Sequence, residues 1–476
     1  MANSFDVVII GAGPAGYVGA LRLAQLGKKV AVVEEARVGG VCLNRGCIPV
    51  KSLLYAAAVA RNAKEAQIMG ITFSPPAIDL VRLGTWKKRI IDRLARGIEF
   101  LFKSNGTELI RGRARLVAPD RLVIQEKETE KEIFARTLVI ATGSEPAVLP
   151  GLEPDHKRVI DSNSALNLVQ LPKSIVIIGA GAIGLEFATI FRRFGVQVTV
   201  LEMCDAILPG VDPELTSFIQ HQLTREGVEI HTGVKGISCS FPAETARVCA
   251  AAPEPLEWQA EKVLVAIGRK ALTAGLGLED LGIRLDQRGF ITTADNYETS
   301  VPGVYAIGDV RGGPLLAHKA LYEGFNLAET LAQTGKPMPG EQKLVPVVVY
   351  TDPEIATVGL SESAAQDRGI KVRVARVPVN AIGRSLTLNR SEGVCKLLMD
   401  EKTGKIIGGG IVAPHADVLI TEITTAIELG LSPDDLSKPI HPHPTMSELV
   451  FEAAHALLGS AIHIVKHHQT ECGPHS

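Results

Sequence analysis

The sequence contains the same glycine-rich segment twice, and this repeat limits the possible folds more than any other feature. Residues 6–34 and 174–202 overlay without a gap at an offset of 168 residues. Glycines and one acid recur in this register: Gly11, Gly13, Gly16, Gly27 and Glu34 correspond to Gly179, Gly181, Gly184, Gly195 and Glu202. So many identities in one ungapped register indicate a repeated structural unit rather than chance.

Each copy has the pattern of a strand, a glycine turn, a helix and a second strand. In the first copy, the apolar run Asp6–Ile10 predicts a parallel strand that is buried on both faces. The G-x-G-x-x-G turn that follows allows close approach of the backbone to a pyrophosphate at the helix N-terminus. The acid that ends the second strand can accept hydrogen bonds from both ribose hydroxyls. The repeat therefore predicts two dinucleotide sites.

Later strands of the two units also end in similar short motifs, at Leu138–Pro146 and Val263–Arg269. Both units close their second strand with Glu and not with a basic residue. At the second site this favours NAD(H), because a carboxylate repels the additional phosphate of NADP.

Length and composition limit the class of protein further. A chain of 476 residues is too long for one core and predicts about three domains. The 46 glycines and 4% aromatic residues are typical of an α/β protein with many tight turns. The net charge of −2 argues against nucleic-acid binding. No apolar run approaches 18 residues, which argues against a membrane-spanning helix.

The cysteines and the N-terminus bear on the compartment. Seven is an odd number of cysteines, and five of them are scattered along the chain, which fits a reducing cytosol better than a disulfide framework. The first strand begins within a few residues of Met1, which leaves no room for a targeting peptide. We therefore expect a cytoplasmic protein.

Two cysteines, Cys42 and Cys47, lie five residues apart in the segment Gly39–Leu54. In a regular helix, Cα atoms five residues apart are about 8.7 Å from each other, whereas a disulfide spans at most about 7 Å. A bridge between them requires the backbone to leave helical geometry, which Asn44 and Gly46 permit. A helix is expected to follow, with Pro49 suited to its first turn and a helix-like run from Ser52 to about Arg61. The two cysteines are either a labile redox pair or two unrelated buried thiols.

The C-terminal third has α+β composition and no nucleotide motif. The Gly- and Pro-rich segment Thr334–Gln342 predicts the boundary before it. Near the end, His443 lies between two prolines at the entrance to a helix, and Glu448 follows it. His443 is either an acid/base that Glu448 orients or a surface residue, and Thr445 with Glu448 also has the spacing of a capping box.

Before the Thr334–Gln342 segment, a predicted strand at Val304–Ile307 ends at Gly308 and Asp309. An Asp at this position either accepts a hydrogen bond from a polyol hydroxyl or caps a turn, and the residues alone do not choose between the two.

Taken together, these segments resemble the FAD-dependent pyridine nucleotide–disulfide oxidoreductases, and among them most resemble the dihydrolipoamide dehydrogenases. The similarity runs from end to end. Its motifs, in the order of the family, are GAGPAGY, GGVCLNRGCIP, ATGSEP, GAGAIGLE, AIGR, AIGD, LLAHKA, YTDPEIATVG and HPHPTMSE. The sequence departs from the family pattern at Arg45, at Val50 and at Lys270–Leu272.

The resemblance implies an α/β chain with two Rossmann-like domains, for FAD and NAD, and a C-terminal α+β dimerisation domain. The implied boundaries are 1–147 for the first part of the FAD domain, 148–270 for the NAD domain, 271–340 for the second part of the FAD domain and 341–476 for the dimerisation domain.

The resemblance also implies roles for individual residues. Those expected to bind FAD are Gly11, Gly13, Gly16, Glu34, Lys51, Ala114, Thr142, Gly143, Asp309 and Ala317. Lys51 is expected near the flavin N5, where it would pair with Glu186. Those expected to bind NAD(H) are Gly179, Gly181, Gly184, Glu202, Val234 and Gly268. The expected catalytic residues are Cys47 as the thiol next to the flavin, Cys42 as the thiol that exchanges with substrate, and His443 held by Glu448. No metal is expected.

The implied reaction is oxidation of protein-bound dihydrolipoyl groups by NAD⁺ through a Cys42–Cys47 disulfide and FAD. The implied assembly is a homodimer in which the other subunit contributes His443, and the implied partners are lipoyl domains of a 2-oxoacid dehydrogenase or glycine cleavage complex. The alternatives are a related disulfide or metal-ion reductase and a non-catalytic subunit that binds lipoyl domains. Retention of both cysteines with His443 and Glu448 argues against a non-catalytic subunit. The tail carries His467, His468 and His475, which could hold a metal but fit a disordered end better.

Overall fold

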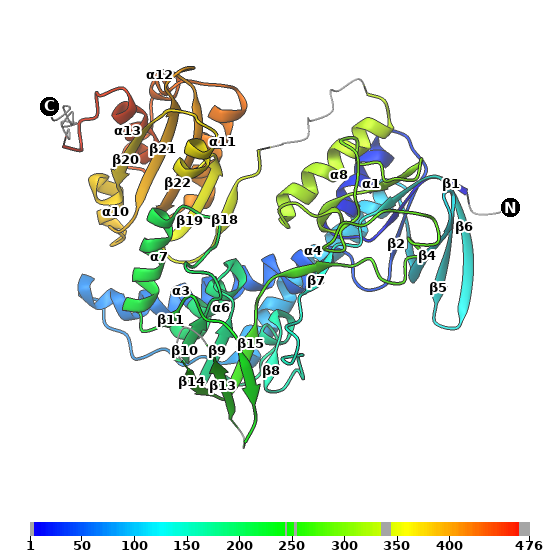
Figure 1. The fold of residues 1–476 in the computed structure, drawn as a ribbon, viewed down its shortest axis with the longest axis horizontal. Coiled ribbons are helices and arrows are strands. Elements are labelled where there is room, and N and C mark those ends of the chain that lie inside the picture. The colour runs from blue at the N-terminus through cyan, green and yellow to red at the C-terminus, as the bar shows by residue number, and fades with distance from the viewer. Residues whose placement is uncertain (1–3, 243–244, 252–254, 335–343, 466–476) are drawn as a thin grey trace. The chain divides into compact units, whose positions relative to one another are not determined.

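The computed structural model describes residues 4–242, 245–251, 255–334 and 344–465, and its chain divides into two compact units (Figure 1). Unit 1 comprises residues 1–203 and 234–343, and unit 2 comprises residues 204–233 and 344–476. Most of the expected linker, 335–342, and the histidines of the tail lie outside the described residues. The finer domain boundaries stay a prediction.

The first sheet of unit 1 is mixed. It is built on β1 (Ser4–Ile10), β2 (Val30–Glu34), β3 (Glu108–Arg111), β4 (Arg113–Ala118), β5 (Arg121–Glu126), β6 (Thr129–Ile140) and β17 (Val304–Ala306). The strand order is β3-β2-β1-β6-β5-β4, and β17 also pairs with β6. β1, β2 and β3 are parallel to one another and to the C-terminal half of β6, while β4 and β5 form an antiparallel extension.

The apolar run in β1 is explained by burial on both sheet faces. Val8 and Ile10 pack in one core cluster, and Val7 and Ile9 pack in another. Because successive side chains of a strand point to opposite faces, a strand covered on both sides needs an unbroken apolar sequence. The predicted buried strand at Asp6–Ile10 is therefore observed.

The helices of this part of unit 1 pack on the sheet or on one another. They are α1 (Pro14–Gln25), α2 (Gly40–Arg45), α3 (Cys47–Glu65), η1 (Ala66–Met69), α4 (Leu80–Ser104), η2 (Gly308–Arg311) and α8 (Ala317–Leu331). α1 and α8 lie side by side (Figure 1). Their backbones approach closely at Gly19 and Gly324, where a Cβ on Gly324 would lie 2.3 Å from the carbonyl oxygen of Ala15. Small residues at this crossing hold the helix of the first glycine turn against α8.

The second copy of the repeat forms a parallel sheet of its own in unit 1. Its elements are β8 (Val159–Ile160), α5 (Ser162–Ala165), β9 (Ser174–Ile178), α6 (Ala182–Arg193), β10 (Gln197–Leu201) and β15 (Lys262–Val265). β10, β9, β15 and β8 are neighbours in that order. Smaller sheets accompany it, formed by β12 (Ser238–Ser240), β13 (Ala246–Ala250) and β14 (Leu256–Ala260), and by β7 (Ser144–Pro146) with β16 (Arg269–Ala271). The repeat therefore folds twice, as predicted.

Unit 2 has an antiparallel sheet in the order β18-β19-β22-β21-β20. The bounds of its strands are β18 (Val347–Val349), β19 (Glu354–Gly359), β20 (Val372–Pro378), β21 (Val394–Asp400) and β22 (Ile406–Ala413), with β11 (Glu229–His231) elsewhere in the unit. Its helices are α7 (Pro213–Arg225), α9 (Glu362–Asp367), η3 (Val379–Ala381), α10 (Gly383–Thr387), α11 (Ala416–Glu428), α12 (Pro433–Ser437) and α13 (Glu448–Leu457). α11 and α13 pack on the sheet and share one apolar core with it.

None of the helices in the described parts of the chain combines the length and the apolar character that crossing a bilayer requires.

Candidate functional site

The two glycine turns have almost the same backbone. Gly13 precedes α1 with φ −71° and ψ −176°, and Gly181 precedes α6 with φ −76° and ψ −176°. Gly11 has φ +105° and Gly179 has φ +107°, a region that favours glycine. The sequence repeat is thus also a repeat of conformation.

Neither turn has room for a side chain at its third glycine, where the backbone folds back on itself. A Cβ on Gly16 or on Gly184 would lie 1.9 Å from the carbonyl oxygen of Gly11 or Gly179, respectively. A Cβ on Gly181, in contrast, would meet no protein atom within 4 Å. Both turns also begin a helix whose first N–H groups are available to an anion. The residues present therefore fit a dinucleotide pyrophosphate at each turn.

The acids at the ends of β2 and β10 hold the turns. Oε2 of Glu34 accepts a hydrogen bond from the Ala12 N–H at 2.8 Å, and Oε2 of Glu202 accepts one from the Ala180 N–H at 2.7 Å. Each carboxylate therefore lies beside its glycine turn, where the ribose of a bound dinucleotide is expected.

The cysteine segment consists of two helices with a break between them. Cys42 lies in α2 and Cys47 begins α3, and Gly46 between them has φ −144° and ψ −113°, outside helical geometry. The expected break is present, but it is made by Gly46 alone. Asn44 is helical, and its side-chain amide donates to the carbonyl oxygens of Val38 and Gly40.

The second helix also starts earlier than expected, at Cys47 rather than at Ser52. Pro49 lies in its first turn, where its missing N–H costs no hydrogen bond. As a result the sulfur of Cys47 is placed at a helix N-terminus, a position that favours a thiolate.

The two sulfurs interact electrostatically. Both are free thiols in the structure and are half-buried. A hydrogen bond from Cys42, with help from the Lys51 ammonium, lowers the pKa of Cys47 to about 7 despite burial, while the same hydrogen bond and burial raise the pKa of Cys42. The pair thus shares one proton near neutral pH, with Cys47 as the thiolate.

Lys51, one turn along α3, is fixed by an acid from the second repeat. Its Nζ lies 2.8 Å and 2.9 Å from the two carboxylate oxygens of Glu186 on α6. Glu186 is buried, whereas the Lys51 side chain is 34% exposed. This ion pair joins the cysteine helix to the helix that follows the second glycine turn.

A polar network that our sequence analysis did not assign lies around Ser144. Its hydroxyl donates to Oδ2 of Asp309 at 2.5 Å and accepts from Nε of Arg269 at 2.7 Å. Burial lowers the pKa of the Arg269 guanidinium, and the charges of Asp309 and Cys47 oppose that change. The sequence did carry a signal, because Ser144 and Arg269 belong to the paired motifs ATGSEP and AIGR.

The other expected cofactor residues lie in strands, in loops and at a helix start of unit 1. Thr142 and Gly143 are tied to Leu272 by a 2.7 Å bond from Thr142 Oγ1 to the Leu272 carbonyl oxygen and a 3.0 Å bond from the Leu272 N–H to the Gly143 carbonyl oxygen. The remaining positions are Ala114, buried in β4, Val234, whose N–H donates to the Glu202 carbonyl, Gly268, whose carbonyl accepts from Ala147, and Ala317, the first residue of α8. Their roles toward a cofactor stay predictions.

His443 is held by Glu448. Its Nδ1 lies 2.8 Å from Oε1 of Glu448, and its side chain is 77% exposed. Oε2 of the same carboxylate accepts from the Thr445 N–H at 2.9 Å. Burial raises the pKa of Glu448, but the hydrogen bonds from His443 and Thr445 outweigh it and lower that pKa.

The complete capping box is not formed. α13 begins at Glu448 itself, with Ser447 as its N-cap, and the Thr445 hydroxyl donates to the carbonyl oxygen of Pro442. Glu448 therefore orients an exposed ring and fixes the backbone before the helix at the same time.

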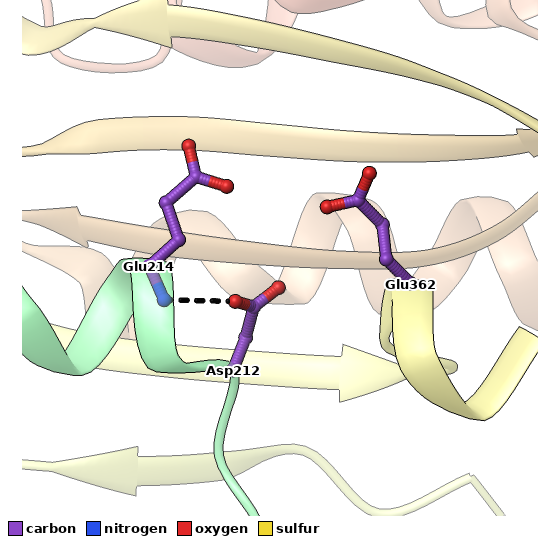
Figure 2. A group of neighbouring side chains, drawn as sticks. All are labelled: Asp212, Glu214 and Glu362. Carbon is purple, nitrogen blue, oxygen red and sulfur yellow. Dashed lines mark hydrogen bonds between the residues drawn. The ribbon is translucent and has the colours of Figure 1, made fainter.

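Another group of acids in unit 2 has a structural explanation. Figure 2 shows Asp212 and Glu214 at the start of α7 converging with Glu362 at the start of α9. The buried Lys396 ammonium contacts all three, at 2.6 Å from Asp212 and 2.8 Å from Glu214. A lysine therefore supplies the positive charge that these carboxylates need.

Comparison with known proteins agrees with this geometry. Residues 5–324 match the model of the pyridine nucleotide-disulphide oxidoreductases, and residues 345–454 match the model of their dimerisation domain. The dihydrolipoyl dehydrogenase of Thermus scotoductus is 44% identical over 97% of this chain and 99% of that protein. That of Geobacillus stearothermophilus is 40% identical over 97% of each chain.

Solved structures are similar over nearly the whole chain. The Cu(II) complex of the HOCl-induced flavoprotein disulfide reductase RclA from Escherichia coli has a TM-score of 0.86 at 30% identity and covers 95% of this chain and 99% of its own. LpdA from Mycobacterium tuberculosis has a TM-score of 0.88 at 26% identity and covers 96% of this chain and 99% of its own. With both glycine turns, the cysteine helices and nearly full-length coverage, the chain belongs to the pyridine nucleotide-disulphide oxidoreductase family.

Proposed function

We propose that this protein is a dihydrolipoyl dehydrogenase, which oxidises protein-bound dihydrolipoyl groups with NAD⁺ through FAD and a Cys42–Cys47 disulfide. The observation that carries the proposal is the thiol pair with a shared proton, at the break between α2 and α3 and within reach of the Lys51 charge. Curated relatives of that activity, 40% to 44% identical over nearly the whole chain, support it.

The first glycine turn, with Gly11, Gly13, Gly16 and Glu34, would hold FAD, and the second, with Gly179, Gly181, Gly184 and Glu202, would hold NAD(H). Further residues of the FAD site would be Lys51, Ala114, Thr142, Gly143, Asp309 and Ala317, and those of the NAD(H) site would be Val234 and Gly268. The fit of a pyrophosphate to each turn supports this assignment. Bound FAD would supply a two-electron acceptor for the reduced thiols and a hydride donor to NAD⁺.

In the thiol half-reaction, one substrate thiolate attacks the sulfur of Cys42. The bond between Cys42 and Cys47 breaks, and Cys47 leaves as a thiolate. The second substrate thiolate then attacks the substrate sulfur of the mixed disulfide, releases Cys42 and closes the lipoyl disulfide. The substrate loses two electrons and two protons, and the cysteine pair gains the electrons. The lowered pKa of Cys47 makes it the better leaving group.

His443 would accept the proton of the incoming thiol, because only the thiolate attacks and a free thiol is mostly protonated at neutral pH. Its 2.8 Å contact with Glu448 supports this role, since a carboxylate on Nδ1 leaves Nε2 as the basic nitrogen. We infer that His443 acts on the cysteines of the other subunit in a homodimer, which the match of residues 345–454 to a dimerisation domain supports.

The biological setting is part of the proposal. The substrate-bearing partners would be lipoyl domains of a 2-oxoacid dehydrogenase or glycine cleavage complex, and the enzyme would work in the cytoplasm. The FAD domain would comprise 1–147 and 271–340, the NAD domain 148–270 and the dimerisation domain 341–476.

Replacement of either cysteine tests the proposal. Cys42→Ser and Cys47→Ser should each reduce lipoamide-dependent NADH formation by roughly a thousandfold or more, because the disulfide can no longer form. Flavin content should stay that of the wild type. The matched control is Cys204→Ser, which alters an exposed thiol outside the Cys42–Cys47 segment. Turnover retained by both variants would contradict the proposal.

A second candidate is a reductase of another disulfide or of a metal ion, and the similarity to RclA favours testing it. Anaerobic reduction with NADH and with NADPH, followed by a panel of lipoamide, glutathione disulfide and Cu(II), separates the two. A higher rate with NADH and lipoamide than with every other pair is the expected result.

A further inference from the structure

A cavity of about 450 Å³ lies in unit 1 among helices α3, α4 and α6 and the segment that follows α5. Its walls are mostly apolar and include Leu53, Ile91, Phe187 and Phe191. This volume falls in the range of small-molecule sites, which combine apolar walls with a few polar groups. The glycine turns, the cysteines and His443 do not line it, so it is separate from the site described above.

The cavity contains one buried charge, the ammonium of Lys87. Lys87 is 6% exposed and donates a hydrogen bond to the carbonyl oxygen of Leu166, which also lines the cavity. Within the described parts of the chain, Lys87 forms no ion pair, and burial lowers its pKa. The other buried lysine described above, Lys396, differs, because three carboxylates neutralise its charge.

A buried cation without a counter-ion is costly, because desolvation is not offset by a partner charge. The single carbonyl uses one of the three N–H donors of the ammonium. A ligand that brought a carboxylate to Lys87 would supply the missing charge, and its apolar body would displace water from the walls.

We propose that this cavity binds an apolar monocarboxylate, with its carboxylate on Lys87 and its hydrocarbon body between α4 and α6. The size of the cavity and the uncompensated cation together define this ligand class. A neutral lipid would leave the cation unpaired, and a small polar anion would leave the walls uncovered.

Such a ligand would also contact the helices that carry the ion pair beside the cysteines. Leu53 lies two residues after Lys51 on α3, and Phe187 directly follows Glu186 on α6. Binding of a ligand in the cavity is therefore expected to change the flavin absorbance of the holoenzyme. The same binding should be measurable as heat.

Titration calorimetry of the holoenzyme with decanoate, below its micellar concentration, tests the proposal. Decan-1-ol has the same body without the charge and should bind at least ten times more weakly. Lys87→Met should weaken decanoate binding by about ten- to a hundredfold, the range of a lost charge-assisted hydrogen bond. Lys103→Met, which removes an exposed charge from the same helix, should leave it unchanged.

A pair of glycine variants tests the location independently of Lys87. A Cβ on Gly84 or on Gly97, both inside α4, would meet no atom within 4 Å, so both should tolerate leucine. Gly84 lines the cavity and Gly97 does not. Gly84→Leu should abolish decanoate binding, and Gly97→Leu should preserve it.

Absence of decanoate binding to the wild type would overturn the proposal. Equal binding of decanoate and decan-1-ol would overturn the role of Lys87, and equal binding by Gly84→Leu and Gly97→Leu would overturn the location. Lipoamide turnover of these variants is measured in parallel, so that failure here is distinguished from failure of the proposed reaction.

Discussion

The two glycine turns share a backbone but differ in what lies against them. A Cβ on Gly13 would have the Cα of Gly40 as its neighbour at 3.8 Å, and a Cβ on Gly40 would lie 2.6 Å from the Cα of Gly13. Gly40 is the first residue of α2, the helix of Cys42. At Gly181, the equivalent position in the second turn, the same space contains no protein atom within 4 Å.

This difference indicates two kinds of dinucleotide site. The first turn is closed by the cysteine helix, so a ligand there is packed against the redox pair and is expected to stay bound. The second turn is open on that side, which suits a cosubstrate that must enter and leave in every cycle. On the proposed assignment, the same motif would serve a resident cofactor in one copy and an exchanging one in the other.

The largest effect is expected from adding a side chain at the third glycine of each turn. Gly16→Ala and Gly184→Ala place a Cβ 1.9 Å from a backbone oxygen, so the turn must move. Gly16→Ala should yield protein with less than about a tenth of the normal flavin, because the resident site is lost. Gly184→Ala should keep its flavin and lose at least about a hundredfold in kcat/KM for NAD⁺.

The ratio of flavin to protein and steady-state kinetics measure both effects. Loss of flavin in Gly184→Ala, or its retention in Gly16→Ala, would show that the two turns are not divided in this way.

A smaller and more selective effect is expected at Gly181. Alanine there fits the protein without a contact, but it takes the space into which the pyrophosphate would come. Gly181→Ala should raise the KM for NADH by about ten- to a hundredfold with unchanged Tm and flavin content. The control is Gly97→Ala, which lies inside α4 rather than in the turn and also meets no atom within 4 Å. A KM equal to that of the wild type would mean that no phosphate approaches this turn.

The acid of the second turn is expected to contribute less. Glu202 is buried beside the turn and offers carboxylate oxygens to a ribose. Glu202→Gln should raise the KM for NADH by about tenfold and should reduce the preference for NADH over NADPH, since the charge that repels the extra phosphate is gone. Glu279→Gln, at an exposed acid of the same unit, is the control. Unchanged preference between the two coenzymes would contradict the assignment.

The sequence predicted these turns because their chemistry is local. The glycines, the buried strand and the closing acid all lie within 29 residues, the length of 6–34, so spacing alone defines them. The network of Ser144, Arg269 and Asp309 was missed because its members are 125 and 165 residues apart. Lys87 was missed for a related reason, since no pattern on α4 shows that its ammonium is buried without an acid.

The early start of α3 was also missed. The sequence placed Pro49 in the first turn, as observed, but its helical run was expected only from Ser52. The structure begins the helix at Cys47 and gives that sulfur its position at the N-terminus.

The smallest expected effect concerns the electrostatics on that closed side. The pKa of Cys47, about 7, is lowered first by the hydrogen bond from Cys42 and second by the Lys51 charge, while burial and Glu186 oppose both. Below the midpoint Cys47 is a thiol, and above it a thiolate, so its alkylation rate should rise as the pH passes through about 7. Lys51→Met should move the midpoint upward by at most about one pH unit, because the hydrogen bond from Cys42 remains.

Alkylation of the reduced protein with iodoacetamide, followed by mass spectrometry of the Cys47 peptide, measures this midpoint. At pH 7 the rate in Lys51→Met should be a few-fold lower than in the wild type, and in the control Lys64→Met, an exposed lysine of the same helix, it should be the same. A midpoint near 7 in Lys51→Met would show that the hydrogen bond from Cys42 and the helix N-terminus stabilise the Cys47 thiolate without the Lys51 charge. In that case the closed side of the first turn would differ from the second turn by its sulfur chemistry and not by its charge.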